Sequence, residues 1–199
     1  MDTKDKILQI GFNLFLERGY KEVSLKDISD AVGLTKGAFY HHFKSKEEMF
    51  RQIVDNYLLE GSDRFYGACS RTSLKQFMYE YLEALIAYMD NIQQQIYSKN
   101  NKSGISFYQI LFDALKIFPD VAEKLKEIHE SERKIWEEVI NNAKAKGEIR
   151  TDFNSKQLAK TFISINDGLG MHSMLEGRLE EVHGEIFTAW NTIYSLIKT

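Results

Sequence analysis

The stretch SLKDISDAVGLTKGAFYHHFKSK, residues 24–46, predicts two short helices separated by a tight turn. Ser24 and Asp27 have the spacing of a capping box that starts the first helix, and Gly33 is suited to end it. Thr35 is a suitable N-cap for the second helix. Two short helices joined by a glycine-containing turn are typical of a helix-turn-helix.

The apolar residues of this stretch recur at helical spacing and predict the faces that pack together: Leu25, Ile28, Val32, Leu34, Phe39 and Phe43. The exposed side of the second helix then carries Thr35, Lys36, Gly37, Tyr40 and His41. A lysine can donate to guanine or to a phosphate, and a glycine lets the backbone approach base edges. Ser24 and Thr35 can cap a helix and contact a phosphate at the same time. These residue types predict contact with DNA.

The charge of the whole chain does not by itself indicate a nucleic-acid-binding protein. Lysine and arginine number 26 against 29 aspartate and glutamate, which gives a net charge of −3. Residues 31–46, however, contain Lys36, Lys44, Lys46 and two histidines without any acidic residue. Because a local cationic patch can bind an anion on a weakly negative molecule, we assign the predicted DNA contact to this patch.

The remaining sequence has a helical pattern throughout. A first helix is predicted to stop at Gly19, and longer amphipathic helices are predicted from Ser73 to about Tyr97, over Phe107–Phe118, from Val121 to near Gly147, from Asn154 onward, and through Ile197. One proline and 12 glycines in 199 residues favour helices over a sheet with many turns. No window approaches the roughly 18 apolar residues of a membrane span, and no signal peptide is recognisable, so we expect a cytoplasmic protein.

Residues 4–60 resemble the DNA-binding domain of TetR/AcrR-family transcriptional regulators. The matching positions extend over several helices and are Phe15, Gly19, Ile28, Gly33, Thr35, Gly37, Tyr40, Phe43 and Lys46. Ser29, Val32 and Thr35 depart mildly from the family, which often has Ala, Ala and Ser there. The resemblance implies phosphate contacts by Thr35, Tyr40 and Lys46. It implies base or mixed contacts by Lys36, Gly37 and His41, and we add Lys44 as a neighbouring cation.

The same resemblance implies an all-α fold of about nine helices in two domains. Residues 1–60 would form the DNA-binding domain with its three-helix helix-turn-helix, and residues 61–199 a helical ligand-binding and dimerisation domain. The implied function is that of a DNA-binding transcriptional regulator, a small-molecule-responsive repressor. It would act as a homodimer on a near-palindromic operator in double-stranded DNA.

Residues 61–199 carry no motif, so candidate ligand-binding residues come from aromatic and polar side chains in the predicted helices. These are Tyr81, Leu85, Tyr88, Phe107, Leu111, Trp136, Phe162, Asn166 and His172. Most aromatic residues here are expected to be core, and only a minority need to line a pocket. Their character favours a hydrophobic or aromatic effector. Apolar faces near the C-terminus predict a dimer interface at Leu169, Leu175, Trp190, Tyr194 and Ile197.

Two other classes of protein remain open at this point. Glu180 and His183 have the Glu-x-x-His spacing of di-iron helical bundles, and His129 and Glu132 also share a helix. A second copy of the motif is absent, as are a glycine-rich phosphate loop and a nucleophile elbow, so we expect no catalytic residues, no metal and no cofactor. A helical protein that binds a partner without DNA is disfavoured by the acid-free patch around Lys36, which has no value for packing.

Overall fold

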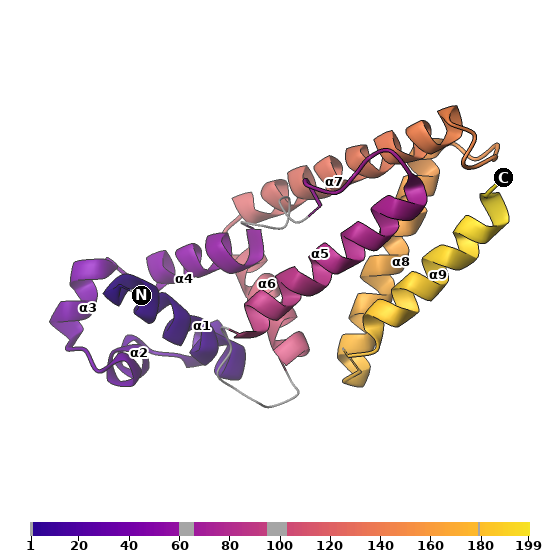
Figure 1. The fold of residues 1–199 in the computed structure, drawn as a ribbon. Coiled ribbons are helices and arrows are strands. Elements are labelled where there is room, and N and C mark those ends of the chain that lie inside the picture. Colours follow the sequence, from indigo (N-terminus) through magenta and orange to yellow (C-terminus); the bar gives the residue numbers. More distant parts are fainter. Residues whose placement is uncertain (1, 60–65, 95–102, 179) are drawn as a thin grey trace. The chain divides into compact units, whose positions relative to one another are not determined.

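The computed structural model describes residues 2–59, 66–94, 103–178 and 180–199 (Figure 1). In this described part, the chain forms nine α-helices and one π-helical turn, and its only β-type contact is an isolated antiparallel bridge between Ile149 and Lys198. The prediction of an all-α fold is therefore confirmed. The chain packs as two units, one made of residues 1–61 and 91–125, the other of residues 62–90 and 126–199.

Four helices open the described chain, and two of them begin after the predicted caps Ser24 and Thr35. They are α1 (Thr3–Glu22), α2 (Leu25–Val32), α3 (Lys36–His42) and α4 (Lys46–Val54), and α4 continues into the π-helical turn η1 (Asp55–Leu59). Ser24, Thr35 and Ser45 each cap the following helix by accepting a backbone N–H three residues on. Gly33 ends α2 in the left-handed conformation, with φ of +79°.

The helix predicted to stop at Gly19 kinks there instead. Gly19 has φ of +78°, and helical structure then resumes as far as Glu22. A Cβ added at this glycine would lie 2.3 Å from Nε2 of Gln109, on α6 (Ser103–Ile117). Beyond the kink, the amide of Tyr20 donates a 3.3 Å hydrogen bond to the carboxylate of Asp113. The kink therefore fits α1 against α6, a contact that the local sequence does not reveal.

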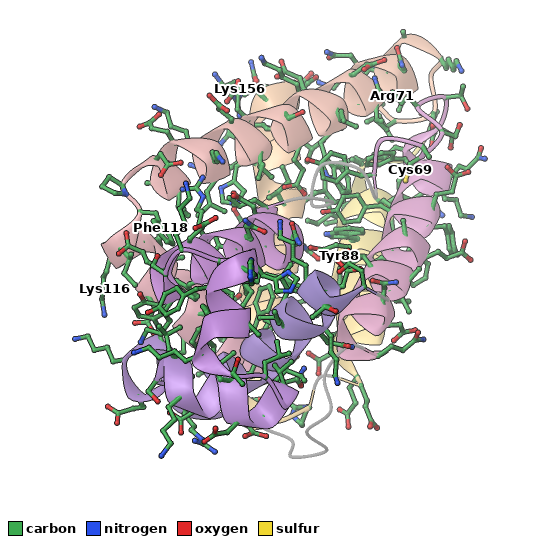
Figure 2. The ribbon with its side chains drawn as sticks, turned by 90° about the vertical axis from the view of Figure 1, so that its left-hand side faces the viewer. Cys69, Arg71, Tyr88, Lys116, Phe118 and Lys156 are labelled. Atoms are coloured by element: carbon green, nitrogen blue, oxygen red, sulfur yellow. The ribbon has the colours of Figure 1, made fainter. Side chains whose placement is uncertain are left out.

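The core of the first unit is rich in aromatic residues. The ring centres of Phe15 and Phe50 are 5.2 Å apart, and the ring of Phe118 lies 5.9 Å from that of Phe50. Phe118, labelled in Figure 2, directly follows α6. This unit joins α6 to the N-terminal helices, so packing does not follow the chain order of the two predicted domains. The assignment of DNA binding to residues 1–60 and of ligand binding to residues 61–199 remains a prediction.

The second unit contains four long helical segments. They are residues 74–90 of α5 (Leu74–Gln94), residues 126–145 of α7 (Asp120–Ala145), α8 (Ser155–Glu176) and α9 (Val182–Ile197). Trp136 stands at the centre of its core, with ring centres of Phe77, Trp190 and Phe162 at 4.8, 4.9 and 5.1 Å. The end predicted for α5 at about Tyr97 lies outside the described residues.

Candidate nucleic-acid interface

The helix-turn-helix in the first unit presents one face of α3 to solvent. Phe39 and Phe43 are each 1% exposed and fix α3 to the unit. Thr35, Lys36, Gly37, Tyr40 and His41 are exposed, with Tyr40 at 44%. The predicted division of α3 into a packed face and a free face is confirmed. Figure 1 shows α2 and α3 as two short consecutive helices in the unit that also contains α1 and α4.

The side chains at the start of α3 are arranged for contact from outside the protein. The hydroxyl of Thr35 accepts a 3.2 Å hydrogen bond from the amide of Ala38, which is the predicted cap. A Cβ added at Gly37 would meet only the Thr35 hydroxyl oxygen, at 3.9 Å. Glycine inside a helix costs about 1 kcal/mol relative to alanine. Because the protein's own packing does not require Gly37, the open space above it suits close approach by another molecule.

Ser24 has a more restricted environment than the sequence indicated. Its hydroxyl donates a short hydrogen bond to the carboxylate of Asp27, and the amide of Ser24 donates to the same carboxylate at 2.8 Å. These hydrogen bonds hold the pKa of Asp27 below its ordinary value. A phosphate at Ser24 would therefore meet a neighbouring negative charge.

The side chain of Lys46 is bonded within the protein, whereas that of Lys44 is exposed to solvent. The Lys46 ammonium donates 2.8 Å hydrogen bonds to the carbonyl oxygens of both Tyr20 and Val23 and lies 4.1 Å from the centre of the Tyr20 ring. Partial burial lowers the pKa of Lys46. Lys46 thus fastens the start of α4 to the end of α1, a role that sequence reasoning missed. Lys44 is exposed, and its backbone amide is bonded to Glu48 at 2.8 Å.

A further cation reaches this region from the first turn of α1. The ammonium of Lys4 lies 5.6 Å from the centre of the Phe43 ring, directly after α3. No sequence signal connects residues 4 and 43, because only the packing of α1 on the helix-turn-helix brings them together. The structure therefore adds Lys4 to the cations around α3.

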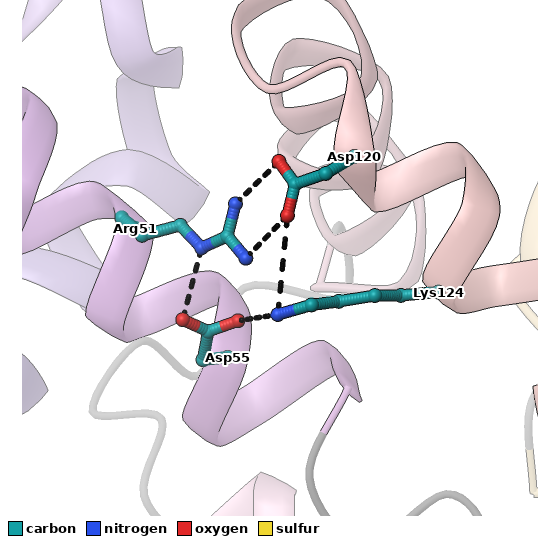
Figure 3. A network of polar contacts seen from close by, with 4 residues as sticks. All are labelled: Arg51, Asp55, Asp120 and Lys124. Atoms are coloured by element: carbon teal, nitrogen blue, oxygen red, sulfur yellow. Dashed lines mark hydrogen bonds and ion pairs between the residues drawn. The ribbon is translucent and has the colours of Figure 1, made fainter.

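The end of α4 is held by a network of charged residues within the first unit (Figure 3). The guanidinium of Arg51 makes two 2.8 Å hydrogen bonds to the carboxylate of Asp120, at the start of α7, and one of 2.9 Å to Asp55. Lys124 lies 3.2 Å from Asp55. The hydrogen bonds that Arg51 donates to the carboxylates of Asp120 and Asp55 raise the pKa of its guanidinium. The network fixes α4 and η1 relative to the first turn of α7.

The candidate ligand-binding residues are divided between the two units. Phe107 and Leu111 are half-buried on α6 in the first unit. In the second unit, Tyr81, Trp136 and Phe162 are buried core residues, whereas Leu85, Tyr88 (Figure 2) and Asn166 are half-buried and His172 is exposed. The core residues of the second unit are brought together, but their role in ligand binding remains a prediction.

The candidate interface residues also fall into two groups. Leu175 is 66% exposed and Leu169 is half-buried, so both reach the surface of α8. Trp190, Tyr194 and Ile197 are only 0, 9 and 6% exposed, and the Trp190 indole donates a 2.9 Å hydrogen bond to the carbonyl oxygen of Phe162. This burial corrects the placement of these three on an interface, because a side chain enclosed by its own protomer cannot contact another.

The features that suggested an enzyme do not form a metal site in the described part of the chain. No group of three His, Cys, Asp or Glu residues there is placed to hold a metal ion. Glu180 and Glu181 precede α9, and His183 lies in its first turn, where burial lowers the pKa of the imidazole. No helix within the described residues has the length and apolar character needed to cross a membrane.

Comparison with known proteins places this arrangement in a family. Residues 7–53 match the family described as bacterial regulatory proteins, tetR family, and residues 82–185 match the tetracyclin repressor-like C-terminal domain. The chain is 26% identical over 153 residues to the transcriptional repressor KstR2 of Mycolicibacterium smegmatis, covering 76% of this chain and 69% of KstR2. It is 25% identical over 197 residues to the repressor ComR of Escherichia coli, covering 94% and 88%.

The fold agrees with these matches. A TetR transcription regulator from Haloarcula marismortui has a TM-score of 0.72 at 16% identity, covering 100% of this chain and 99% of that chain. The family match over residues 82–185 alone includes more than half of the sequence. The protein therefore belongs to the TetR family of DNA-binding transcriptional regulators, whose members bind operator DNA, form homodimers and bind small-molecule effectors.

Proposed function

We propose that this protein is a cytoplasmic repressor that binds a near-palindromic operator as a homodimer and releases it when a small molecule binds. The observation that carries the proposal is the exposed, acid-free face of α3, supported from behind by the buried Phe39 and Phe43. In a dimer, two α3 helices would enter successive major grooves, about 34–36 Å apart. KstR2 and ComR are repressors, which supports this direction of regulation.

The proposed DNA contacts divide into phosphate and base contacts. Thr35 and Tyr40 would bind phosphates, with Ser24 and Lys44 at the edge of the contact. Lys46 uses two of its three N–H groups on Tyr20 and Val23, which leaves one for a phosphate. Lys36, Gly37 and His41 would face base edges.

The proposed dimer uses the solvent-exposed sides of α8 and α9, which pack on each other. On α9, Gly184, Thr188, Thr192, Ser195 and Leu196 are exposed, and residues 186–197 contain no charged residue. On α8, Gly168, Met171 and Leu175 are exposed. A helix face that is open to water but uncharged is suited to contact the same face of a second copy.

The proposed effector site lies in the predicted ligand-binding domain, residues 61–199, among the candidate residues of the second unit. An effector shifts regulation only by its different affinity for the DNA-binding conformation and the released conformation. Membership in a family of transcriptional regulators excludes the enzyme that Glu180 and His183 suggested.

The proposed DNA binding is tested with the full chain and a pool of randomised duplexes. Repeated selection should enrich a near-palindromic sequence whose half-sites are one helical turn apart. Lys36→Ala should then relax the preference at one or two positions in each half-site, because a base contact is lost. Enrichment of a single asymmetric site, or of no sequence at all, would contradict the proposal.

A further inference from the structure

The core of the second unit contains a carboxyl group that DNA binding does not use. Glu132, on α7, is 7% exposed, and its Oε1 accepts a 2.5 Å hydrogen bond from the hydroxyl of Tyr81, which is 2% exposed. Across the described residues, the Glu132 side chain has no other hydrogen bond and no ion pair. A carboxylate removed from water without a cation is costly, so a residue of this kind is poorly explained by packing alone.

A second polar group in the same place lacks a partner. Trp136 lies one helical turn after Glu132 on α7, on the same face. It is 0% exposed, and its indole N–H has no hydrogen-bond acceptor within the described part of the chain. The centre of its ring is 5.5 Å from that of Tyr81. A buried donor without an acceptor is uncommon in folded proteins, and here it belongs to a residue one helical turn from the buried Glu132.

Further aromatic rings pack against Tyr81, the partner of Glu132, and against Trp136. The ring of Trp190 lies 5.5 Å from Tyr81 and 4.9 Å from Trp136, and the ring of Phe162 stacks on Trp136 at 5.1 Å. The faces of aromatic rings attract cations, most strongly when water is excluded. The cluster therefore offers an acidic oxygen and π faces, which are the groups that a hydrophobic cation prefers.

The charges around Glu132 do not neutralise it. The hydroxyl of Tyr81, on α5, donates a hydrogen bond to Glu132. The negative charge of Asp167, on α8, raises the pKa of Glu132, and His129, on α7, lowers the pKa of Asp167. Burial, together with Asp167, raises the pKa of Glu132 to about 7, although the Tyr81 hydrogen bond opposes the rise. A bound cation would supply the missing positive charge.

We propose that Glu132, Tyr81 and Trp136 recognise the ammonium group of an effector that is a hydrophobic amine. The ammonium pairs with Glu132 and lies against the rings, and an oxygen on the same ligand can accept the Trp136 N–H. This inference rests on the proposed ligand response and gives its chemical class. The rings must separate to admit the ligand, so the ligand-bound conformation differs from the one described here. The ligand therefore binds one conformation more tightly than the other, as an effector must.

The test uses three probes of the same shape and different charge: phenylbutylamine, phenylbutanol and phenylbutyrate. The chain has two tryptophans, Trp136 and Trp190, and both lie in the cluster, so intrinsic fluorescence reports binding directly. The amine should change the fluorescence saturably and bind at least about tenfold more tightly than the alcohol, as expected for a charged hydrogen bond. Equal binding of amine and alcohol, preferential binding of phenylbutyrate, or no saturable binding of the amine would overturn the proposal.

The Glu132→Gln variant identifies the group responsible. It has nearly the same shape as the natural residue and should lose the preference for amine over alcohol, whereas Glu127→Gln, at an exposed position on the same helix, should keep it. For the natural protein, amine affinity should rise about tenfold per pH unit below about 7 and level off above it, because the cation binds ionised Glu132. An unchanged preference in Glu132→Gln would reject the assignment.

DNA binding separates this inference from the proposed function. If the chain selects an operator but shows no preference for the amine, the inference fails and the proposed repressor stands. If the chain selects no operator, the proposed function fails whatever the amine does. If phenylbutyrate binds and releases the operator, the ligand response holds and only the effector class is wrong.

Discussion

The ammonium of Lys46 donates a 2.8 Å hydrogen bond to the carbonyl oxygen of Tyr20 and lies 4.1 Å from the centre of the same residue's ring. Together with the bond to Val23, this contact fixes the start of α4 against the last turn of α1. It assigns Lys46 a structural role in addition to the phosphate contact that we propose.

Lys46→Ala should therefore have two separate effects. Loss of the charged hydrogen bonds should lower the free energy of unfolding by about 1–3 kcal/mol, measured by urea denaturation. Loss of a phosphate contact should make the fall of log affinity with log salt less steep, by about one unit of slope. Lys116→Ala, at an exposed position on α6 (Figure 2), is the control and should change neither. An unchanged salt slope would leave Lys46 as a structural residue only.

Gly37→Ala should make the protein more stable and a poorer DNA-binding protein. Nothing in the protein blocks a Cβ there, so the helix should gain up to about 1 kcal/mol in stability. If the backbone at residue 37 approaches base edges, the added methyl group should weaken operator binding by about tenfold or more. Thermal unfolding and fluorescence anisotropy with labelled operator measure the two effects. A variant that binds operator as tightly as the natural protein would remove Gly37 from the interface.

Thr188→Arg should convert the proposed dimer to monomers. Thr188 lies on the uncharged, exposed face of α9, and the symmetry of a dimer would bring two added arginines close together. Sedimentation velocity should show one species of half the mass and unchanged helical content. Gln76→Arg, on the exposed side of α5, should remain dimeric.

Trp190→Phe distinguishes the buried face of α9 from the exposed one. Trp190 is 0% exposed, so this change should lower stability and leave the mass of the oligomer unchanged. Monomers from Trp190→Phe together with dimers from Thr188→Arg would reverse our assignment of the two faces.

Glu132→Gln should alter the dependence of stability on pH. The unfolded carboxyl ionises near 4.5 and the folded one near 7, so between these values the folded state binds more protons than the unfolded state. The contribution of Glu132 to the free energy of unfolding therefore falls as pH rises from about 4.5 to about 7 and is constant above that. The free energy of unfolding of Glu132→Gln, minus that of the natural protein, should therefore increase over this range. Between pH 4 and pH 8 the increase should be on the order of 3 kcal/mol. A constant difference from pH 4 to 8 would show that Glu132 has an ordinary pKa.

The helix-turn-helix was predictable in most of its parts. The capping box of Ser24 and Asp27, the cap at Thr35 and the burial of Phe39 and Phe43 all agree with the sequence. Each of these features depends on residues no more than four positions apart, so local spacing is sufficient to predict it.

Contacts between distant residues were not predictable in the same way. The start of α5 illustrates this. The hydroxyl of Ser73 accepts a hydrogen bond from the amide of Gln76, three residues on, but the carboxylate of Glu148 also accepts hydrogen bonds from the amides of Leu74 and Lys75, at 3.0 and 2.9 Å. Similarly, helical spacing identifies the apolar face of Trp190, Tyr194 and Ile197 but cannot say whether that face meets its own protomer or another.

The sequence by itself determined the all-α fold, the helix-turn-helix and the residues that α3 exposes to solvent, because helix caps and apolar periodicity are properties of neighbouring residues. Only the tertiary structure decided that Lys46 holds α1, that Trp190 belongs to the core and that Glu132 is buried against Tyr81. These depend on which helix faces come together across 26 to 51 residues of chain, and the free energy that selects them comes from packing and desolvation over the whole unit.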